Sequence, residues 1–307
     1  MRIYTITLNP AYDVHAFAEH FEPFHENMAA ITSRQAGGKG VNISRALRIN
    51  GIANTAVVVL GKDNGGDFKT GLTEAGIDAI LLEKPGRIRE NLTLHCADSP
   101  ETRISFAGFP VDESILQEVS QVLTVDNQTV ITFTGRVASG MSMEKVKEFL
   151  LDLKKQGAKI ELDSKSFDLE DIYQVQPWLI KPNQEEISQY LGCQVETIPE
   201  AAEKAKVFAD HGISNVMVSL GEQGALLLSG GKTYIATPPT VEAVSTIGAG
   251  DSSIAGFIAA ASLGETSAQC LCRAVSYGTS ACLTEGTLPP LPEDVAAILQ
   301  QVTVHQL

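Results

Sequence analysis

The sequence predicts an α/β fold built on a mostly parallel sheet. Short runs rich in β-branched residues recur along the chain, and segments with helical periodicity separate most of them. This alternation is typical of βαβ units, in which helices connect parallel strands. No internal repeat, low-complexity tract or linker divides the 307 residues, so a single domain spanning 1–307 is expected.

The strands of this sheet are expected where the runs are most regular, at residues 3–8, 55–60, 130–132, 159–162, 178–180 and 216–220. Apolar residues recur every three or four positions from Val41 to Ile49 and from Met143 to Leu153. A helix is therefore expected in each of these two segments.

Two regions break the alternation, because residues 12–35 and 89–106 contain strand-like runs without helices between them. We expect these regions to form a small β lid over one edge of the sheet. Two surface hairpins without a function would give the same pattern.

The charge of the chain restricts its partners. With 37 acidic and 23 basic side chains, the formal net charge is -14, so the average surface repels nucleic acids and anionic membranes. An anionic ligand therefore needs a local basic pocket. Five scattered cysteines without a CxxC pair indicate neither a disulfide framework nor a zinc site. With no signal peptide or membrane-length apolar segment, a cytoplasmic location is expected.

The first motif that could bind a ligand is the glycine-rich segment 35–42. Gly37, Gly38 and Lys39 stand directly before the helix expected near Val41. Glycines allow a ligand to approach the backbone, and a helix N-terminus attracts anions. The segment is not a Walker A loop, because Gly40 stands where that motif requires serine or threonine. A plain turn into a helix, with an exposed lysine, is the alternative.

The second motif spans 245–252 and precedes another segment with helical spacing. Gly248 and Gly250 at a helix N-terminus would form an anion hole, and Asp251 in the first turn could accept a proton during phosphoryl transfer. Asp251 could instead only stabilise the helix, whose dipole is expected to lower its pKa. A dinucleotide-binding GxGxxG is disfavoured, because Ser253 replaces its third glycine.

The third motif, Lys181 to Glu186, has two interpretations. Asn183 can cap the following helix, and Glu186 three residues later completes a capping box. The same two residues could instead lie near a hydrated Mg²⁺ ion. Separately, Arg87, Arg89 and Arg103 in the region of the expected lid could bind phosphate as planar forks, although scattered arginines are usually only solvated.

Three segments carry a resemblance to a known family: Thr-Leu-Asn-Pro-Ala-Tyr-Asp at 7–13, Gly-Gly-Lys-Gly-Val-Asn at 37–42, and Val-Ser-Thr-Ile-Gly-Ala-Gly-Asp-Ser at 244–252. With these, the sequence resembles the PfkB (ribokinase-like) carbohydrate kinases from end to end. The resemblance implies a ribokinase-like three-layer sandwich with a β lid, ATP and Mg²⁺ as cofactors, a sugar-phosphate substrate, and often a homodimer formed through the lid.

The resemblance also implies roles for individual residues. Asp251 would be the catalytic base, beside an anion hole of Gly248, Ala249 and Gly250. The sugar phosphate would be held by Asp13, Gly38, Lys39, Asn42, Arg89 and Arg103. The nucleotide would be lined by Asn183, Ser219, Gly221, Gly224 and Gly250. Asn183 and Glu186 would associate with Mg²⁺ through water.

One departure from the family pattern lies near the acceptor. Where relatives usually read Gly-Ser-Leu-Pro, this chain has Gly-Arg-Val-Ala at 135–138, so Arg136 is expected to enter the acceptor site or to replace a lost contact. The likeness at 9–13 and 105–109 implies phosphorylation of fructose 1-phosphate at its 6-hydroxyl, giving fructose 1,6-bisphosphate. Conversion of tagatose 6-phosphate to tagatose 1,6-bisphosphate is the alternative, and a non-catalytic sugar-phosphate-binding protein is a more distant one.

Overall fold

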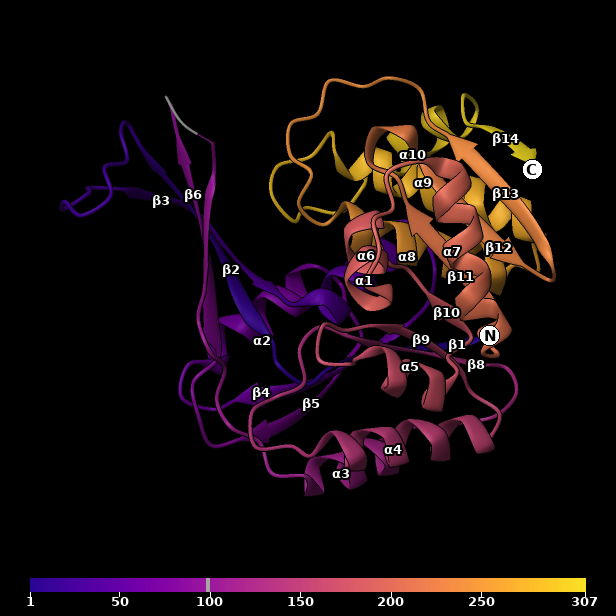
Figure 1. Cartoon of the computed structure of the whole chain (residues 1–307). Helices are drawn as coiled ribbons and strands as arrows, with labels where there is room; N and C mark the ends of the chain where they lie inside the picture. The colour runs from indigo at the N-terminus through magenta and orange to yellow at the C-terminus, as the bar shows by residue number, and fades with distance from the viewer. Residues whose placement is uncertain (98–99) are drawn as a thin grey trace.

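The computed structural model describes residues 1–97 and 100–307, and these ranges contain two sheets (Figure 1). The larger sheet has the strand order β14-β13-β12-β11-β10-β9-β8-β1-β4-β5. From β11 to β5 in this order, neighbouring strands are parallel, and β12, β13 and β14 extend one edge in antiparallel fashion. The predicted α/β fold with a mostly parallel sheet is confirmed.

The strands of this sheet have the bounds β1 Arg2–Thr7, β4 Thr55–Gly61, β5 Ala79–Lys84, β8 Thr129–Thr134, β9 Lys159–Asp163, β10 Leu179–Ile180, β11 Asn215–Ser219, β12 Ala225–Ser229, β13 Lys232–Thr237 and β14 Thr303–Gln306. All six strands expected from the sequence are therefore present, within two residues at each end. β4 is almost completely buried, which explains its uninterrupted apolar sequence.

Helices cover both faces of the large sheet (Figure 1). Side chains of β8 alternate between the faces: Val130 packs in a cluster with α1, α8, α9 and α10, whereas Ile131 and Phe133 pack with α3, α4, α5 and α7. The bounds of the helices are α1 Lys39–Ile49, α2 Gly65–Glu74, α3 Ser114–Val122, α4 Met143–Lys155, α5 Leu169–Val175, α6 Gln184–Leu191, α7 Ile198–Asp210, α8 Ala249–Ser262, α9 Ser267–Ala281 and α10 Pro292–Leu299.

The helix expected near Val41 begins two residues earlier, at Lys39. Gly38 precedes it with a φ of 111°, a backbone conformation that glycine adopts most readily. The chain can therefore turn directly from strand β3 into α1, and Lys39 becomes the first helical residue. Across the described residues, none of the helices combines the length and apolar character needed to span a membrane.

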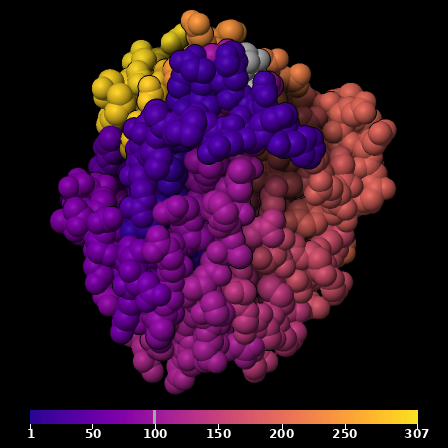
Figure 2. Space-filling model, turned by 90° about the vertical axis from the view of Figure 1, so that its left-hand side faces the viewer, coloured from indigo at the N-terminus to yellow at the C-terminus, as the bar shows by residue number. Residues whose placement is uncertain are grey.

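The second sheet has four strands in the order β3-β2-β6-β7, with bounds β2 Ala11–Ala18, β3 Ala30–Gly37, β6 Arg89–Cys96 and β7 Thr102–Ser105. It stands beside the larger sheet in Figure 1, and its indigo residues form the upper surface in Figure 2. β1 leads almost directly into β2, and β3 into α1, so this sheet is attached where the proposed site lies. The region 89–106 also includes residues 98–99, which lie outside the described residues.

Candidate active site

Three charged side chains meet at the carboxyl end of β9. Lys39 is the first residue of α1, Asp163 the last residue of β9, and Asp251 the third residue of α8. Lys39 Nζ lies 2.6 Å from Asp163 Oδ2 and 3.4 Å from Asp251 Oδ1. From the same helix α1, Asn42 Nδ2 donates a hydrogen bond to Asp251 Oδ2 at 3.2 Å. Residues that are far apart in the sequence thus form one polar cluster.

The environment of Asp251 differs from the one expected. Burial raises the pKa of this carboxyl group above its ordinary value; Lys39 opposes the shift, and the charge of Asp163 reinforces it. The expectation of a lowered pKa at this helix N-terminus was wrong, because the loss of solvation on burial is the largest effect on this carboxyl group. A carboxylate with a raised pKa accepts a proton more readily, so Asp251 is better suited to act as a base than its sequence position indicated.

The two acids of β9 have opposite electrostatic character. Burial raises the pKa of Glu161 well above its usual value, and neither of its carboxylate oxygens has a hydrogen-bond partner among the described residues. Burial also acts on Asp163, but the charges of Lys39 and Lys181 hold the pKa of Asp163 below its usual value. The pKa of Lys39 is raised, because the charges of Asp163 and Asp251 together outweigh the opposite effect of burial. Lys39 and Asp163 therefore form an ion pair beside Glu161, whose charged form is disfavoured by burial.

The N-terminus of α8 offers an anion-binding position next to Asp251. Gly248 is the N-cap residue, with a φ of 80°. Ala249 and Gly250 follow as the first helical residues, where backbone N–H groups are not all used by the helix itself. A Cβ added at Gly250 would lie 3.1 Å from Lys181 Nζ, so this lysine closely approaches the same turn. Helix dipole, N–H donors and lysine charge together suit a phosphoryl group.

Asp13 connects the second sheet to the start of α1. Its Oδ1 accepts a hydrogen bond from Asn91 Nδ2 at 3.0 Å, and its Oδ2 accepts one from Thr287 Oγ1 at 3.3 Å. Gly37 lies so close that an added Cβ would overlap the Asp13 carboxylate, and Gly38 follows directly before Lys39. Asp13 and Gly38 therefore lie beside the polar cluster, on the side of the second sheet.

The arginines predicted from the sequence to bind the acceptor lie in different environments. Arg89 is half-buried at the start of β6, and its Nη1 donates to Asn91 Oδ1 at 3.2 Å. Burial lowers the pKa of Arg89; Asp13 opposes this shift, and Arg136 adds to it, so these three residues are near neighbours. Arg103, which is exposed on β7, instead acts on His15 of β2. The charge of Asp13 thus acts on Arg89, on which Arg136 also acts, and on the buried Arg45 of α1.

The residues expected along the nucleotide gather at the carboxyl ends of β10 and β11. Asn183 and Ser219 form an isolated parallel β-bridge. Gly221 and Gly224 lie in the turn between β11 and β12, where the Gly224 N–H donates to the Gly221 carbonyl at 3.1 Å. The structure therefore brings these four residues to one edge of the sheet.

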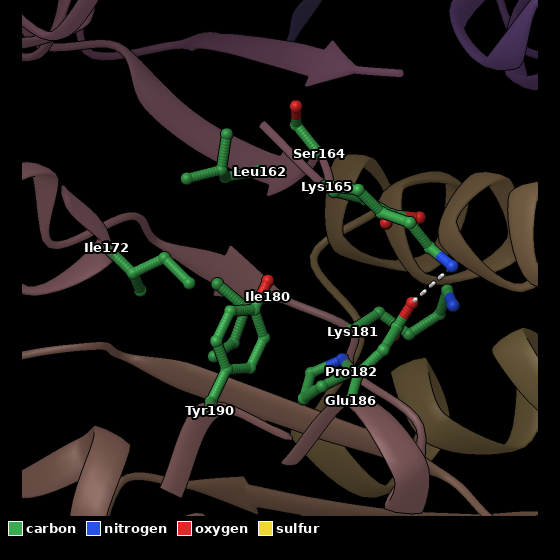
Figure 3. Close-up of a pocket in the computed structure, with 10 residues that line it drawn as sticks. Leu162, Ser164, Lys165, Ile172, Ile180, Lys181, Pro182, Glu186 and Tyr190 are labelled. Atoms are coloured by element: carbon green, nitrogen blue, oxygen red, sulfur yellow. Dashed lines mark ion pairs between the residues drawn. The ribbon is translucent and has the colours of Figure 1, made fainter. Parts of the chain in front are cut away.

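Asn183 and Glu186 form the capping box of α6. Asn183 Oδ1 accepts from the Glu186 N–H at 2.7 Å, and Glu186 Oε2 accepts from the Asn183 N–H at 3.1 Å. The other oxygen, Glu186 Oε1, lies 3.7 Å from Lys165 Nζ (Figure 3). The two hydrogen bonds of a capping box are thus present, and Glu186 Oε1 takes no part in them.

A small cavity of about 20 Å³ lies beside this carboxylate, with room for about one water molecule (Figure 3). Its walls come from the ends of β9 and β10 and from α6, and they include both Asp163 and Glu186. Asp163 and Glu186 offer carboxylate oxygens, the kind of ligand that Mg²⁺ prefers, although the cavity itself is too small for an ion that keeps several water ligands. The described residues contain no group of three or more His, Cys, Asp or Glu side chains able to hold a metal by themselves.

Some residues of the site were missed by sequence reasoning. Asp163 holds Lys39, Glu161 lies beside it, and Lys181 approaches the anion hole, yet none of them was selected as a site residue. A signal for Asp163 existed, because it directly follows the strand run 159–162 at the edge where parallel sheets bind ligands. Asn91 and Thr287, which hold Asp13, carry no recognisable motif.

A buried carboxylate of raised pKa, a glycine-lined helix N-terminus and two converging lysines define a phosphotransferase that acts on a hydroxyl group. Comparison with known proteins specifies this class further. The sequence matches the pfkB family carbohydrate kinases over residues 8–294, and the chain belongs to this family. It is a sugar-phosphate kinase, and membership of the family implies the use of ATP.

Individual relatives agree with this classification. The chain is 35% identical over 259 residues to 1-phosphofructokinase of Escherichia coli strain K12, covering 84% of this chain and 83% of that protein. It is 30% identical over 311 residues to 1-phosphofructokinase of Rhodobacter capsulatus, covering 100% and 98%. Its structure resembles phosphofructokinase-2 of Escherichia coli in complex with substrates and products, with a TM-score of 0.91, 25% identity and coverage of 98% and 99%. The resemblance noted in the sequence is confirmed.

Proposed function

We propose that this protein transfers the γ-phosphoryl group of ATP to the 6-hydroxyl of fructose 1-phosphate, giving ADP and fructose 1,6-bisphosphate. The observation that carries the proposal is the position of Asp251, buried in the first turn of α8 with Lys39 and Asn42 on its two oxygens. The 1-phosphofructokinases among the relatives support fructose 1-phosphate as the acceptor.

In the proposed step, the 6-hydroxyl oxygen forms a bond to the γ-phosphorus while the bond from that phosphorus to the ADP oxygen breaks. The hydroxyl proton passes to Asp251, whose raised pKa favours this transfer. Negative charge on the transferred group is stabilised by the N–H groups of Gly248, Ala249 and Gly250 and by the lysines beside them. Each component thus acts at the position where charge develops.

The acceptor is proposed to lie between the polar cluster and the second sheet. Asp13 would bind sugar hydroxyls, and Arg89 with Arg136 would bind the phosphate already present, because guanidinium groups bind phosphate with two parallel hydrogen bonds. Arg103, on the neighbouring strand β7, is proposed as a further phosphate ligand. Lys39 lies 3.4 Å from Asp251, which favours a role at the transferred group over one at the distant phosphate of the acceptor.

Arg89→Met is expected to raise the KM for fructose 1-phosphate by roughly tenfold to a hundredfold, the usual effect of losing a charged hydrogen bond. The KM for ATP should stay within about twofold. Steady-state kinetics with each substrate varied in turn measures both constants. Arg87→Met removes an exposed arginine two residues earlier and is the matched control. An increase in the KM for ATP alone would place Arg89 on the nucleotide side and invert the proposed orientation.

Magnesium is proposed to bind through water near Asn183 and Glu186, with Asp163 as the second carboxylate of the small cavity. When bound with ATP, the ion neutralises charge on the phosphate oxygens. Ser219, Gly221 and Gly224 are proposed to line the nucleotide at the same edge of the sheet. The proposal requires Glu186 to do more than cap α6.

Glu186→Gln should therefore raise the magnesium concentration needed for half-maximal rate by roughly tenfold or more, the usual effect of losing an outer ligand of a metal. Magnesium titrations at saturating ATP and sugar phosphate measure this value. The matched control is Glu200→Gln, because Glu200 closes the equivalent capping box with Thr197 on α7. Should both variants lose similar thermal stability with an unchanged magnesium requirement, Glu186 is only a cap.

We also propose a homodimer formed through the second sheet. Large apolar side chains are exposed there, including Ile31 on β3, which is 68% exposed, and Phe106 after β7, which is 53% exposed. Exposed apolar surface of this kind marks an interaction site. Light scattering should give twice the mass of the 32.8 kDa chain, and Ile31→Lys should give the monomer mass. A monomeric wild-type protein would contradict this assembly.

A further inference from the structure

A second cavity, of about 790 Å³, lies outside the site described above. It is bounded by β3, the C-terminal half of α1, α2 and the segment at Leu288 and Pro289. Its volume is within the range of small-molecule sites. Three arginines line it, namely Arg34, Arg45 and Arg48, and we call it the arginine cavity. None of these residues has a role in the proposed phosphoryl transfer.

Arg45 gives the arginine cavity an unsatisfied cationic donor. The side chain is only 8% exposed, and its Nη2 donates to the Ala36 carbonyl. Its Nη1 is buried and has no hydrogen-bond partner within residues 1–97 and 100–307. An unpartnered buried donor, above all a charged one, is costly, and the charge of Asp13 offsets this cost only in part. A small turn of the Arg45 side chain toward the cavity would let Nη1 donate to the acceptor oxygens of a ligand.

The other two arginines add charge at more accessible positions. The guanidinium group of Arg34 lies 3.5 Å from the centre of the Tyr12 ring and pairs with Asp67 at 3.2 Å and Glu90 at 3.5 Å. Arg48 lies exposed on α1. The acids lining the cavity are Asp67, already paired with Arg34, and Glu74. Three arginines and two acids thus line the cavity, a small excess of positive charge in a protein with a net charge of -14.

The arginine cavity and the acceptor side of the active site lie on opposite faces of β2. Consecutive side chains of a strand point to opposite faces, and Tyr12 lines the cavity whereas Asp13 contacts Asn91 and Thr287. The acceptor's phosphate, placed near Arg89 and Arg136, therefore cannot also occupy the cavity. The two positions share the wall formed by β2 and β3, and the charge of Asp13 acts on Arg45 from the acceptor side.

We infer that the arginine cavity is a second anion-binding site, which takes a phosphoryl group of a small molecule. Guanidinium groups match the geometry of phosphate oxygens, and Arg45 offers a donor that is already dehydrated. Ile49, Leu288 and Pro289 add apolar walls next to the arginines, which can contact an organic group attached to the phosphate. The ligand is therefore a phosphomonoester of a small organic molecule, with inorganic phosphate as the simpler source of the same chemistry.

Isothermal titration of the full-length protein with inorganic phosphate tests the inference. Two classes of site are expected in the wild type, one in the active site and one in the arginine cavity. Arg48→Glu and Thr70→Glu place a carboxylate in the cavity at exposed positions, where folding is not at risk. Each should raise the Kd of one class by about tenfold or more and leave the other class unchanged. Arg45→Met should act in the same direction.

Arg2→Met is the control, because Arg2 is an exposed arginine paired with Asp126 outside the cavity. This substitution should leave the Kd values of both classes of site within about twofold of the wild-type values. Phenyl phosphate distinguishes the two sources: tighter binding than inorganic phosphate in the arginine-dependent class identifies an organic phosphomonoester, and equal binding identifies free phosphate. A single class of site in the wild type, or isotherms of Arg48→Glu and Thr70→Glu that match the wild type, would overturn the inference.

Discussion

Asp251→Asn is expected to lower kcat by roughly 10²- to 10⁴-fold, the contribution of a positioned proton acceptor. The amide keeps the size of the side chain and can still accept the hydrogen bond from Asn42, but it cannot take the proton of the attacking hydroxyl. The KM for the sugar phosphate should change little, because the lost interaction belongs to the transition state. Steady-state kinetics of purified wild type and variant measures both constants.

The control for this substitution is Glu293→Gln, which removes an acid from the first turn of α10. Both acids occupy a position that favours negative charge at a helix N-terminus. If Asp251 served only to stabilise α8, the two substitutions would have similar small effects on stability and on rate. A decrease in kcat of less than about tenfold for Asp251→Asn would remove this residue from the role of base.

Lys39→Met is expected to lower kcat by roughly 10²- to 10³-fold, as is usual for the loss of one preorganised charge donor in a transition state. The pH profile should also change in a defined direction. As the proposed base, Asp251 would act when deprotonated, so activity should be present above its pKa and be lost as the pH falls through that pKa. Since Lys39 lowers the pKa of Asp251, its removal should move the acidic limb of the kcat profile to higher pH.

Lys155→Met is the matched control, because Lys155 is an exposed lysine at the end of α4. It should leave both kcat and the acidic limb unchanged. A lower kcat for Lys39→Met with an unshifted limb would show that Lys39 does not act on Asp251. Its effect would then come from substrate binding alone.

The central sheet could be predicted because its strands are buried and carry continuous β-branched runs, as in Thr55–Gly61. The edge strands could not. The side chains of β14, Thr303–Gln306, are all exposed, so no apolar pattern marks it, and it exists only through its pairing with β13. The early start of α1 depends on the conformation of Gly38, which the expected apolar periodicity does not report.

The candidate site was predictable as separate motifs but not as an arrangement. Lys39, Asn42 and Asp251 were selected individually, and the structure shows that they touch. The pairing of Lys39 with Asp163 arises because the start of α1 and the end of β9 meet at the same edge of the sheet, which leaves no local signal in either segment. The direction of the pKa shift of Asp251 also depends on burial, and burial is a property of the folded chain.

The most direct test of the proposed function is a coupled assay of ATP consumption that compares four acceptors by kcat/KM. These are fructose 1-phosphate, fructose 6-phosphate, tagatose 6-phosphate and free fructose. We expect fructose 1-phosphate to have the highest value and to exceed free fructose by about a hundredfold or more, because Arg89 and Arg136 are proposed to bind its phosphate. A higher value for tagatose 6-phosphate would contradict the assigned substrate, and equal values for free fructose and fructose 1-phosphate would contradict a phosphorylated acceptor altogether.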